Sequence, residues 1–265
     1  MSLATAFTAR RQPTSAEAEA VQAEARRMAA AVASPPETLI IPVGRIMALL
    51  ATAVTLVIAL SLVQDLLIFL APELGFTDRV WRLDLDTEVS LPTWLSSGLM
   101  LICALALLAL GMQARREGLR KALPWLLLSA AFFFVSLDES ISLHEFMSAV
   151  IGAQVDKGGL FYFVWTVPAL IACVIGLACF LPFILGFKGL DRALLLGSAV
   201  VFLSGAIGLE MIGGSVAEVA GIDNLRYRLL ATAEESLEFA GLLLFLLFLL
   251  RRLRALKGGL TLRVE

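Results

Sequence analysis

The sequence is poor in the residues that usually build metal and redox sites. It contains one histidine, His144, and three cysteines, Cys103, Cys173 and Cys179, with no Cys-x-x-Cys spacing. All three cysteines fall inside long apolar stretches. Neither a disulfide framework nor a thiolate metal site is therefore predicted. Charged residues are also scarce, at 17% of the chain, compared with about 25% in soluble domains.

Apolar residues are abundant instead. They make up 59% of the 265 residues, and the mean hydropathy is +0.89. A helix needs about 20 apolar residues to cross the hydrocarbon core of a bilayer. Six stretches meet this requirement, at approximately 46–71, 95–113, 122–138 or beyond, 160–186, 193–217 and 229–250. The sequence predicts an all-α integral membrane protein with a six-helix transmembrane bundle whose main partner is the lipid bilayer.

The chain divides into three predicted parts: a polar arm at 1–44, the transmembrane domain at 45–252 and a short basic tail at 253–265. The arm has no long apolar core and is not a secretory signal peptide. Its Ala and Glu content favours a marginal helix that ends before Pro35 and Pro36. We expect a disordered or surface-lying arm, with docking of a membrane-protein partner as the alternative. No feature indicates nucleic-acid binding, and the oligomeric state is left open.

The basic residues predict the orientation of the bundle. With both termini in the cytoplasm, sixteen Lys and Arg residues lie inside and five lie outside. The positive-inside rule favours this arrangement. Aromatic residues, including Trp81, Trp94 and Trp165, then fall at the outer ends of helices, as in an aromatic belt. We expect a protein of the bacterial inner membrane.

Acidic residues recur at one depth in four of the predicted spans. Measured from the span centres, they lie roughly 3 to 10 Å outside the midplane, at a rise of about 1.5 Å per residue. An ionised acid at such a depth is costly, and it usually faces the bundle interior and marks function. The acids are Asp65, Asp138, Glu210, Glu234, Glu235 and Glu238.

The stretch "SLDESISLHE", residues 136–145, carries further acids beside the only histidine. On one straight helix Glu139 and His144 point about 140° apart, so only a helix break brings them together. An alternative is that Ser136 and Glu139 form a capping box that begins a short outer helix. Salt bridges from Arg226 or Arg228 to Glu210 and to the "EESLE" acids, 234–238, are the structural alternative across the bundle.

Many carboxylates with one imidazole suit hard or borderline cations. We therefore predict a divalent metal site, with Fe, Mn, Zn, Ca or Mg as the candidate cofactors. A structural zinc site would need more nitrogen or sulfur ligands. A di-iron carboxylate site would need two Glu-x-x-His pairs, and none is present. The predicted ligands are Glu139, His144, Glu210, Glu235 and Glu238, with Asp138 or Glu145 as the catalytic base and Asp65 and Glu234 as further pocket candidates.

Two known motifs are approached but not matched. "LDE" and Ser140-x-x-x-His144 are similar to pieces of the alkaline ceramidase superfamily, which holds zinc with three histidines; a single histidine excludes catalytic membership. "RLDLDTEVSLPTW" begins like a calcium loop, but Val89 and Leu95 replace the required Gly and Glu. That segment is predicted to be an acidic outer loop, followed by a helix that starts at Pro92 and Trp94.

The combined motifs "LDTEVSLPTWLSS", "SLDESISLHE", "GLEMIGG" and "EESLEFAG" resemble multi-pass bacterial membrane proteins of unknown function. The resemblance covers about 46–250 and implies a shared fold and a shared acid cluster, but no activity.

Three functions are compatible with this pattern. The first is a metal-binding protein, hydrolytic or redox-active on a lipid-soluble substrate. The second is an accessory or assembly subunit of a larger membrane complex, in which the acids pair with arginines. The third is a proton- or cation-coupled transporter, although no internal repeat or pair of broken helices is evident.

Overall fold

The computed structural model describes residues 14–33 and 42–256, and they form two units. The first unit is a single helix, α1 (Ser15–Ala33), which matches the helix expected before Pro35. Pro35 and Pro36 themselves lie outside the described residues. The second unit is a helical bundle that begins at Val43, and no strand occurs in the described residues.

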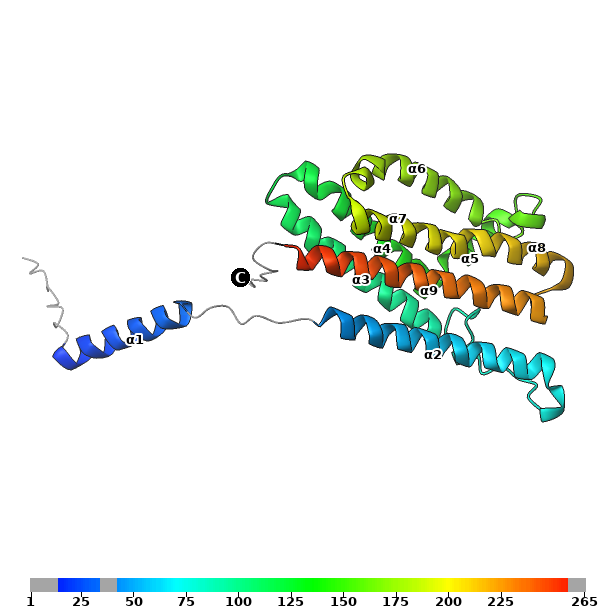
Figure 1. Ribbon diagram of the computed structural model, residues 1–265, viewed down its shortest axis with the longest axis horizontal. Coiled ribbons are helices and arrows are strands. Elements are labelled where there is room, and N and C mark those ends of the chain that lie inside the picture. The colour runs from blue at the N-terminus through cyan, green and yellow to red at the C-terminus, as the bar shows by residue number, and fades with distance from the viewer. Residues whose placement is uncertain (1–13, 34–41, 257–265) are drawn as a thin grey trace, which may run out of the picture. The chain divides into compact units, whose positions relative to one another are not determined.

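The bundle is built from long helices in antiparallel order (Figure 1). They are α2 (Val43–Leu70), α3 (Leu91–Arg115), α4 (Leu119–Ile141), α5 (Leu143–Gly152), α6 (Thr166–Leu185), α7 (Gly189–Leu203), α8 (Glu210–Ala220) and α9 (Leu225–Arg254). Single 3-10 turns lie at Pro72–Leu74, Trp81–Leu83 and Gly159–Phe161. The loops that follow α2, α5 and α8 lie together at one end of the bundle, which we call the loop end.

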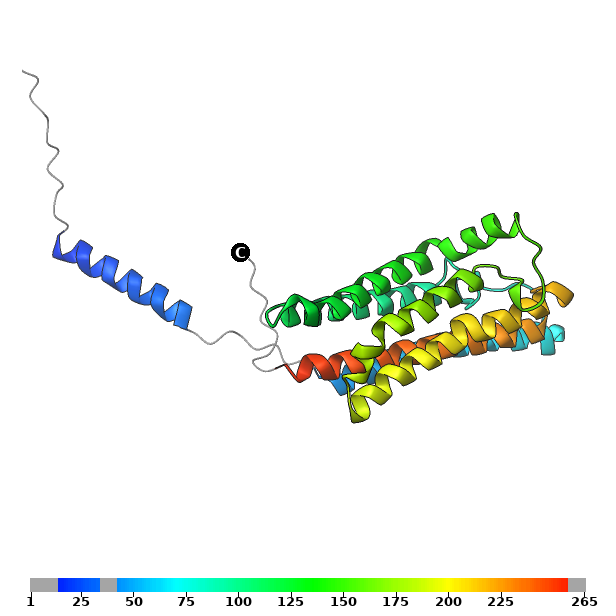
Figure 2. The same ribbon diagram turned by 90° about the horizontal axis from the view of Figure 1, so that it is seen from above.

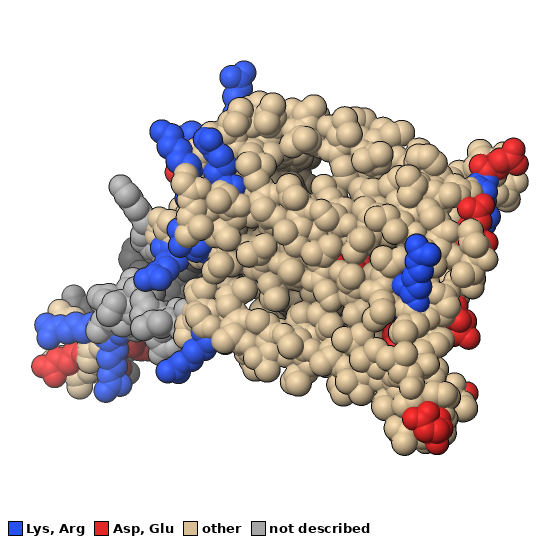
Figure 3. Space-filling view, turned by 45° about the vertical axis from the view of Figure 1, so that its right-hand side comes forward, with Lys and Arg blue, Asp and Glu red and all other residues tan. Residues whose placement is uncertain are grey.

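Five of these segments are long and apolar enough to cross a membrane: α2, α3, α4, α6 and the continuous stretch Gly189–Ala220. Large apolar side chains such as Leu56, Val174 and Ile175 are more than half exposed on α2 and α6. In Figure 3 a broad band of mostly uncharged side chains separates most Lys and Arg at one end of the bundle from most Asp and Glu at the other. The bundle is therefore suited to a bilayer.

Helix α9 lies at the centre of the packing, in contact with α2, α3, α7 and α8. Phe239, Phe248 and Leu249 of α9 are fully buried and pack in one core with Leu99 and Leu107 of α3. Helices α3 and α4 form a closely packed pair, which Figure 2 shows running side by side. The core thus holds α9 with its polar first half directed toward the loop end.

Two glycines allow α9 to lie very close to the fifth apolar segment. A Cβ on Gly241 would fall 2.6 Å from Cβ of Phe202, and one on Gly205 would fall 2.6 Å from the carbonyl oxygen of Glu234. Gly205 belongs to a π-helical stretch, Ser204–Leu209, that joins α7 to α8. Of the glycines close before Glu210, Gly205 allows this close approach, whereas Gly208 meets no neighbouring segment.

Helix α4 ends at Ile141, inside the stretch "SLDESISLHE". Ser142 adopts a left-handed conformation, with φ of 55°, and separates α4 from α5. The helix break that the sequence analysis considered is therefore present, and it lies at Ser142. The capping box at Ser136 and Glu139 is wrong, because both residues lie inside α4. The acidic segment before α3 is a loop, as predicted, and α3 starts at Leu91 with Pro92 in its first turn and Ser90 as its cap.

Candidate functional site

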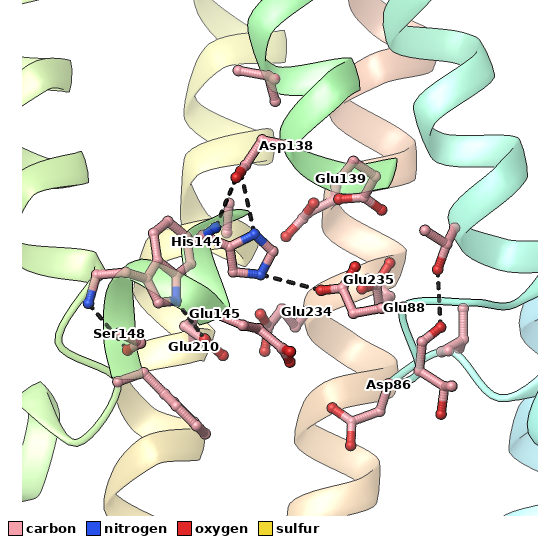
Figure 4. Close-up of a pocket in the computed structure, with 18 of the residues that line it drawn as sticks. Asp86, Glu88, Asp138, Glu139, His144, Glu145, Ser148, Glu210, Glu234 and Glu235 are labelled. Carbon is pink, nitrogen blue, oxygen red and sulfur yellow. Dashed lines mark hydrogen bonds and ion pairs between the residues drawn. The ribbon is translucent and has the colours of Figure 1, made fainter. Parts of the chain in front are cut away.

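A cavity of about 440 Å³ lies near the loop end of the bundle. Its walls come from the loop before α3, from α3, α4 and α5, from the segment around Gly159–Phe161, and from α7, α8 and α9. Figure 4 shows acidic side chains from these elements facing one space. The carboxylates that line the cavity are Asp86, Glu88, Asp138, Glu139, Glu145, Glu210, Glu234, Glu235 and Glu238.

His144 lies between two of these carboxylates (Figure 4). Its Nδ1 is 3.2 Å from Asp138 Oδ2 and its Nε2 is 3.3 Å from Glu88 Oε1. The backbone N–H of His144 also donates to Asp138 Oδ1, at 2.8 Å. The turn at Ser142 makes this possible, because it brings the first residues of α5 back onto the last turn of α4.

The two carboxylates keep this imidazole charged. Burial alone would lower the pKa of His144, but the hydrogen bonds with Asp138 and Glu88 outweigh burial and raise its pKa to about 10. An imidazolium can donate from both ring nitrogens, which fits an acceptor on each side. As an imidazolium, His144 is a double donor toward these two carboxylates.

The acids of α9 face the cavity without such partners. The side chains of Glu235 and Glu238 make no hydrogen bond or ion pair within the part of the chain that the structure describes, and the side chain of Glu234 meets only the carboxyl group of Glu210. Glu235 and Glu238 lie deep among protein atoms, and the surface they keep faces the cavity. Across from them, Glu139 Oε1 accepts a 2.5 Å hydrogen bond from the Ser96 hydroxyl of α3. Glu210 accepts from the indole N–H of Trp165, at 3.0 Å.

A second set of acids lies beside the cavity around one buried arginine. Arg228, whose side chain is 6% exposed, contacts Asp65 of α2 and both Asp84 and Asp86 of the loop before α3. Asp65 also meets Arg79, at 3.0 Å. The Tyr227 hydroxyl donates to Asp86, and the Leu85 N–H donates to Ser61. We call Arg228, Asp65, Asp84 and Asp86 the arginine-centred group.

Asp86 belongs to both regions, because it lines the cavity and contacts Arg228 at 2.7 Å. Burial raises the pKa of Asp86 to about 6, and the attraction of Arg228 only partly opposes that rise. For Glu145, burial and the charge of Glu88 raise the pKa above its ordinary value.

The charge of the cavity is not balanced by the surrounding side chains. Asp138 and Glu88 share His144, and Asp86 meets Arg228. Lys157 lines the cavity as well, but it makes no ion pair with the described acids. The remaining carboxylates have no cationic partner within 4.0 Å among the described residues: Glu139, Glu145, Glu210, Glu234, Glu235 and Glu238.

The cavity unites most, but not all, of the predicted site residues. The predicted ligands and bases all line it, and so does Glu234, whereas Asp65 lies outside it. Arg228 contacts other acids rather than Glu210 or the "EESLE" acids, so the salt bridges considered for those residues are wrong within the described chain. Within residues 14–33 and 42–256, no group of three His, Cys, Asp or Glu side chains is arranged to hold a metal ion.

Several residues of the site were missed by sequence reasoning. The sequence predicts only an acidic loop at Glu88 and only a membrane-interface position for Trp165. Arg228 was considered only as a partner for other acids. The available signal was the density of acids in "RLDLDTEV", together with an arginine in the helix that carries "EESLE".

The bundle and its cavity define a helical protein with five segments apolar enough to cross a membrane and a carboxylate-lined cavity at one end. The chain belongs to the family described as Domain of unknown function (DUF8692), whose model matches residues 47–253. It matches no curated protein and no solved structure.

Proposed function

We propose that this protein is a multi-pass membrane protein whose cavity binds a divalent cation. The observation that carries the proposal is the charge imbalance: six carboxylates share one cavity without a cationic partner among the described residues. Neighbouring carboxylates in a poorly solvated site must either share protons or bind cations. A bound cation of charge +2 relieves more of this repulsion than any single proton does.

The inner acids are the proposed ligands. Glu139 on α4 lies near Glu235 and Glu238 on α9, where the three charges repel one another. Oxygen ligands of this kind suit Mg²⁺, Ca²⁺, Mn²⁺ and Fe²⁺ better than Zn²⁺. Their side chains do not form a ready-made three-ligand group among the described residues. This arrangement favours an ion such as Mg²⁺, which keeps several waters and needs only one or two carboxylates.

Glu145 is the better of the two candidate bases. Asp138 is held by the ring and the backbone of His144, whereas Glu145 is exposed at the cavity and has no ionic partner in the described chain. Its raised pKa also brings it closer to neutral pH, as a general base requires. A hydrolytic or redox reaction on a lipid-soluble substrate would use Glu145 in this role.

The orientation is part of the proposal. Helix α9 (Leu225–Arg254) is long enough to be the sixth span, with its acids directed into the cavity rather than into lipid. Six spans place both termini in the cytoplasm and the cavity on the outer side of the inner membrane. The excess of Lys and Arg at the opposite end supports this orientation.

The test is the metal content and metal affinity of the protein in lipid nanodiscs. Elemental analysis and calorimetric titration with Mg²⁺, Ca²⁺, Mn²⁺ and Fe²⁺ should detect about one site per chain. Glu235→Gln should weaken binding by at least tenfold. Glu73→Gln, an identical change at an exposed residue outside the cavity, should leave it intact. Absence of binding by the unmodified protein for all four ions would refute the proposal.

Cation transport is the second candidate, and one feature favours it. The π-helical stretch Ser204–Leu209 interrupts the fifth apolar segment directly before Glu210, and such interruptions often occur at functional sites. Flux of the bound cation into liposomes would establish transport, whereas binding without flux would leave a static site. An accessory role is less well supported, because the acids of α9 do not pair with arginines in the described structure.

A further inference from the structure

The cavity has a second kind of wall that a bare metal ion would not use. Its volume of about 440 Å³ falls within the range of roughly 300 to 1,000 Å³ that is typical of small-molecule sites. Apolar and aromatic side chains line it beside the acids: Met100, Val135, Tyr162, Phe163, Trp165, Phe202 and Tyr227. Such a surface contributes free energy only to a ligand that itself carries apolar groups.

One of these aromatic rings already lies against a cation of the protein itself. The Lys157 ammonium lies 5.2 Å from the centre of the Tyr162 ring. This separation is within the roughly 6 Å over which an aromatic face attracts a cation. Lys157 therefore shows an alkylammonium group accommodated by the wall of this cavity.

A cation that enters the cavity favours the ionised form of the deep acids, which then supply the opposite charge. Glu235 and Glu238 are surrounded by protein and directed at the cavity, and neither has a hydrogen-bond or ion-pair partner among the described residues. Phe202 and Met100 line the cavity together with Glu238. A negatively charged and partly apolar enclosure of this kind matches a molecule that carries a positive charge next to a hydrocarbon group.

We propose that the cavity binds a small organic ammonium ion that carries a short apolar substituent. The ammonium group is held by the α9 carboxylates and the face of the Tyr162 ring, and the substituent contacts the apolar wall that includes Phe202 and Met100. Lys157 occupies part of this wall in the free protein and is displaced by the ligand. The inference rests on the proposed function only in treating the unpaired carboxylates as cation acceptors, and it does not require a metal.

Calorimetric titration of the full chain in nanodiscs tests this ligand class. The probes are n-butylammonium and tetramethylammonium, with n-butanol as the uncharged control and empty nanodiscs as the blank. The ammonium ions should bind and butanol should not, because both charge and apolar contact are needed. The inference is overturned if no ammonium ion binds, or if butanol binds equally well.

Variants of the aromatic wall test the geometry. Lys157→Met should tighten ammonium binding severalfold, because it removes a competing cation from an exposed position where folding is not at risk. Arg82→Met is the matched control, since Arg82 lies 4.3 Å from the Trp81 ring outside the cavity. Tyr162→Leu should weaken binding by about tenfold, whereas Tyr162→Phe, which keeps the ring, should not.

The combined results separate this inference from the proposed metal site. Metal binding without ammonium binding overturns the inference and leaves the proposed function intact. Ammonium binding without metal binding overturns the proposed metal site and supports the inference. If neither the ammonium ions nor the metal ions bind, both proposals are overturned. Ammonium affinity that is unchanged in both Lys157→Met and Tyr162→Leu also overturns the inference.

Discussion

Two groups of acids lie next to each other near the loop end of the bundle, and their charges are balanced in different ways. In the arginine-centred group, one buried guanidinium contacts Asp65, Asp84 and Asp86. The acids of α9, only two turns further along the helix that carries Arg228, have no cation among the described residues. We call Glu234, Glu235 and Glu238 the unpaired group.

The difference separates a structural role from a functional one. A buried acid that meets an arginine positions two segments relative to each other and needs no ligand. Here the arginine-centred group fixes the loop before α3 against α2 and α9. The same loop contains Glu88, which contacts His144. A buried acid without a partner must obtain its compensation from protons or from a bound species. The unpaired group is therefore the part of the cavity in which a ligand is expected.

Replacement of Arg228, the cation that the arginine-centred group shares, should cause the largest loss of stability. Arg228→Met leaves Asp84 buried without a cationic partner and leaves Asp65 with Arg79 alone, which we expect to lower the free energy of unfolding by about 3 to 5 kcal/mol. Denaturant or thermal unfolding in detergent would measure the loss. Arg226→Met is the control, because Arg226 lies two residues away on the same helix, is exposed and makes no ion pair among the described residues. Equal stability of the two variants would contradict a structural role for Arg228.

Replacing a carboxylate by an amide should lower the stability of the protein in the arginine-centred group, but not in the unpaired group. Asp65→Asn removes a charge that Arg228 and Arg79 both contact, and it should destabilise the protein by about 2 to 3 kcal/mol. Glu235→Gln removes a charge that only repels its neighbours. It should preserve stability or raise it by about 1 kcal/mol when no cation is added. The unfolding midpoints of both variants, measured under the same conditions, test this prediction. A destabilised Glu235→Gln protein would contradict it, because it would show that Glu235 has a partner.

The smallest effect concerns His144, which contacts Glu88 of the loop before α3. Its pKa of about 10 is above the ordinary histidine value of about 6.5. Its stabilising contribution should therefore be complete below pH 6.5 and be lost as the pH rises through about 10. Because His144 is the only histidine, NMR of a tag-free protein would report one imidazole titration. Glu88→Gln should lower that pKa by about one unit, which is ~1.4 kcal/mol, and an unchanged titration would mean that Glu88 does not hold the ring.

The apolar stretches predicted most of the fold, because long hydrophobic runs have few alternatives to membrane helices. The expected helix boundaries agree with the observed ones to within a few residues for α2 and α3. The first half of α9 is harder to interpret, because its charges give it the composition of a surface helix. Its place at the centre of the bundle depends on contacts with four other helices, and no local pattern encodes these.

The site was predicted in part, for a related reason. Depth along each helix correctly grouped Asp138, Glu210 and the α9 acids into one cavity, because helical rise is regular. Depth could not show that Asp65, at a similar level, faces Arg228 instead. The turn at Ser142 was also beyond reach, because a non-glycine residue with positive φ has no reliable signature in a single sequence. Without that turn, His144 would not meet Asp138.

The central place of α9 also determines when the cavity can exist during synthesis of the protein. Arg228, Glu234, Glu235 and Glu238 leave the ribosome after all the other elements that line the cavity. Until they arrive, Asp65 and the loop before α3 have no arginine from α9, and Glu139 and His144 face an incomplete wall. Insertion of the last helix of the bundle thus completes the polar interior in one step, and any ligand must wait for that step.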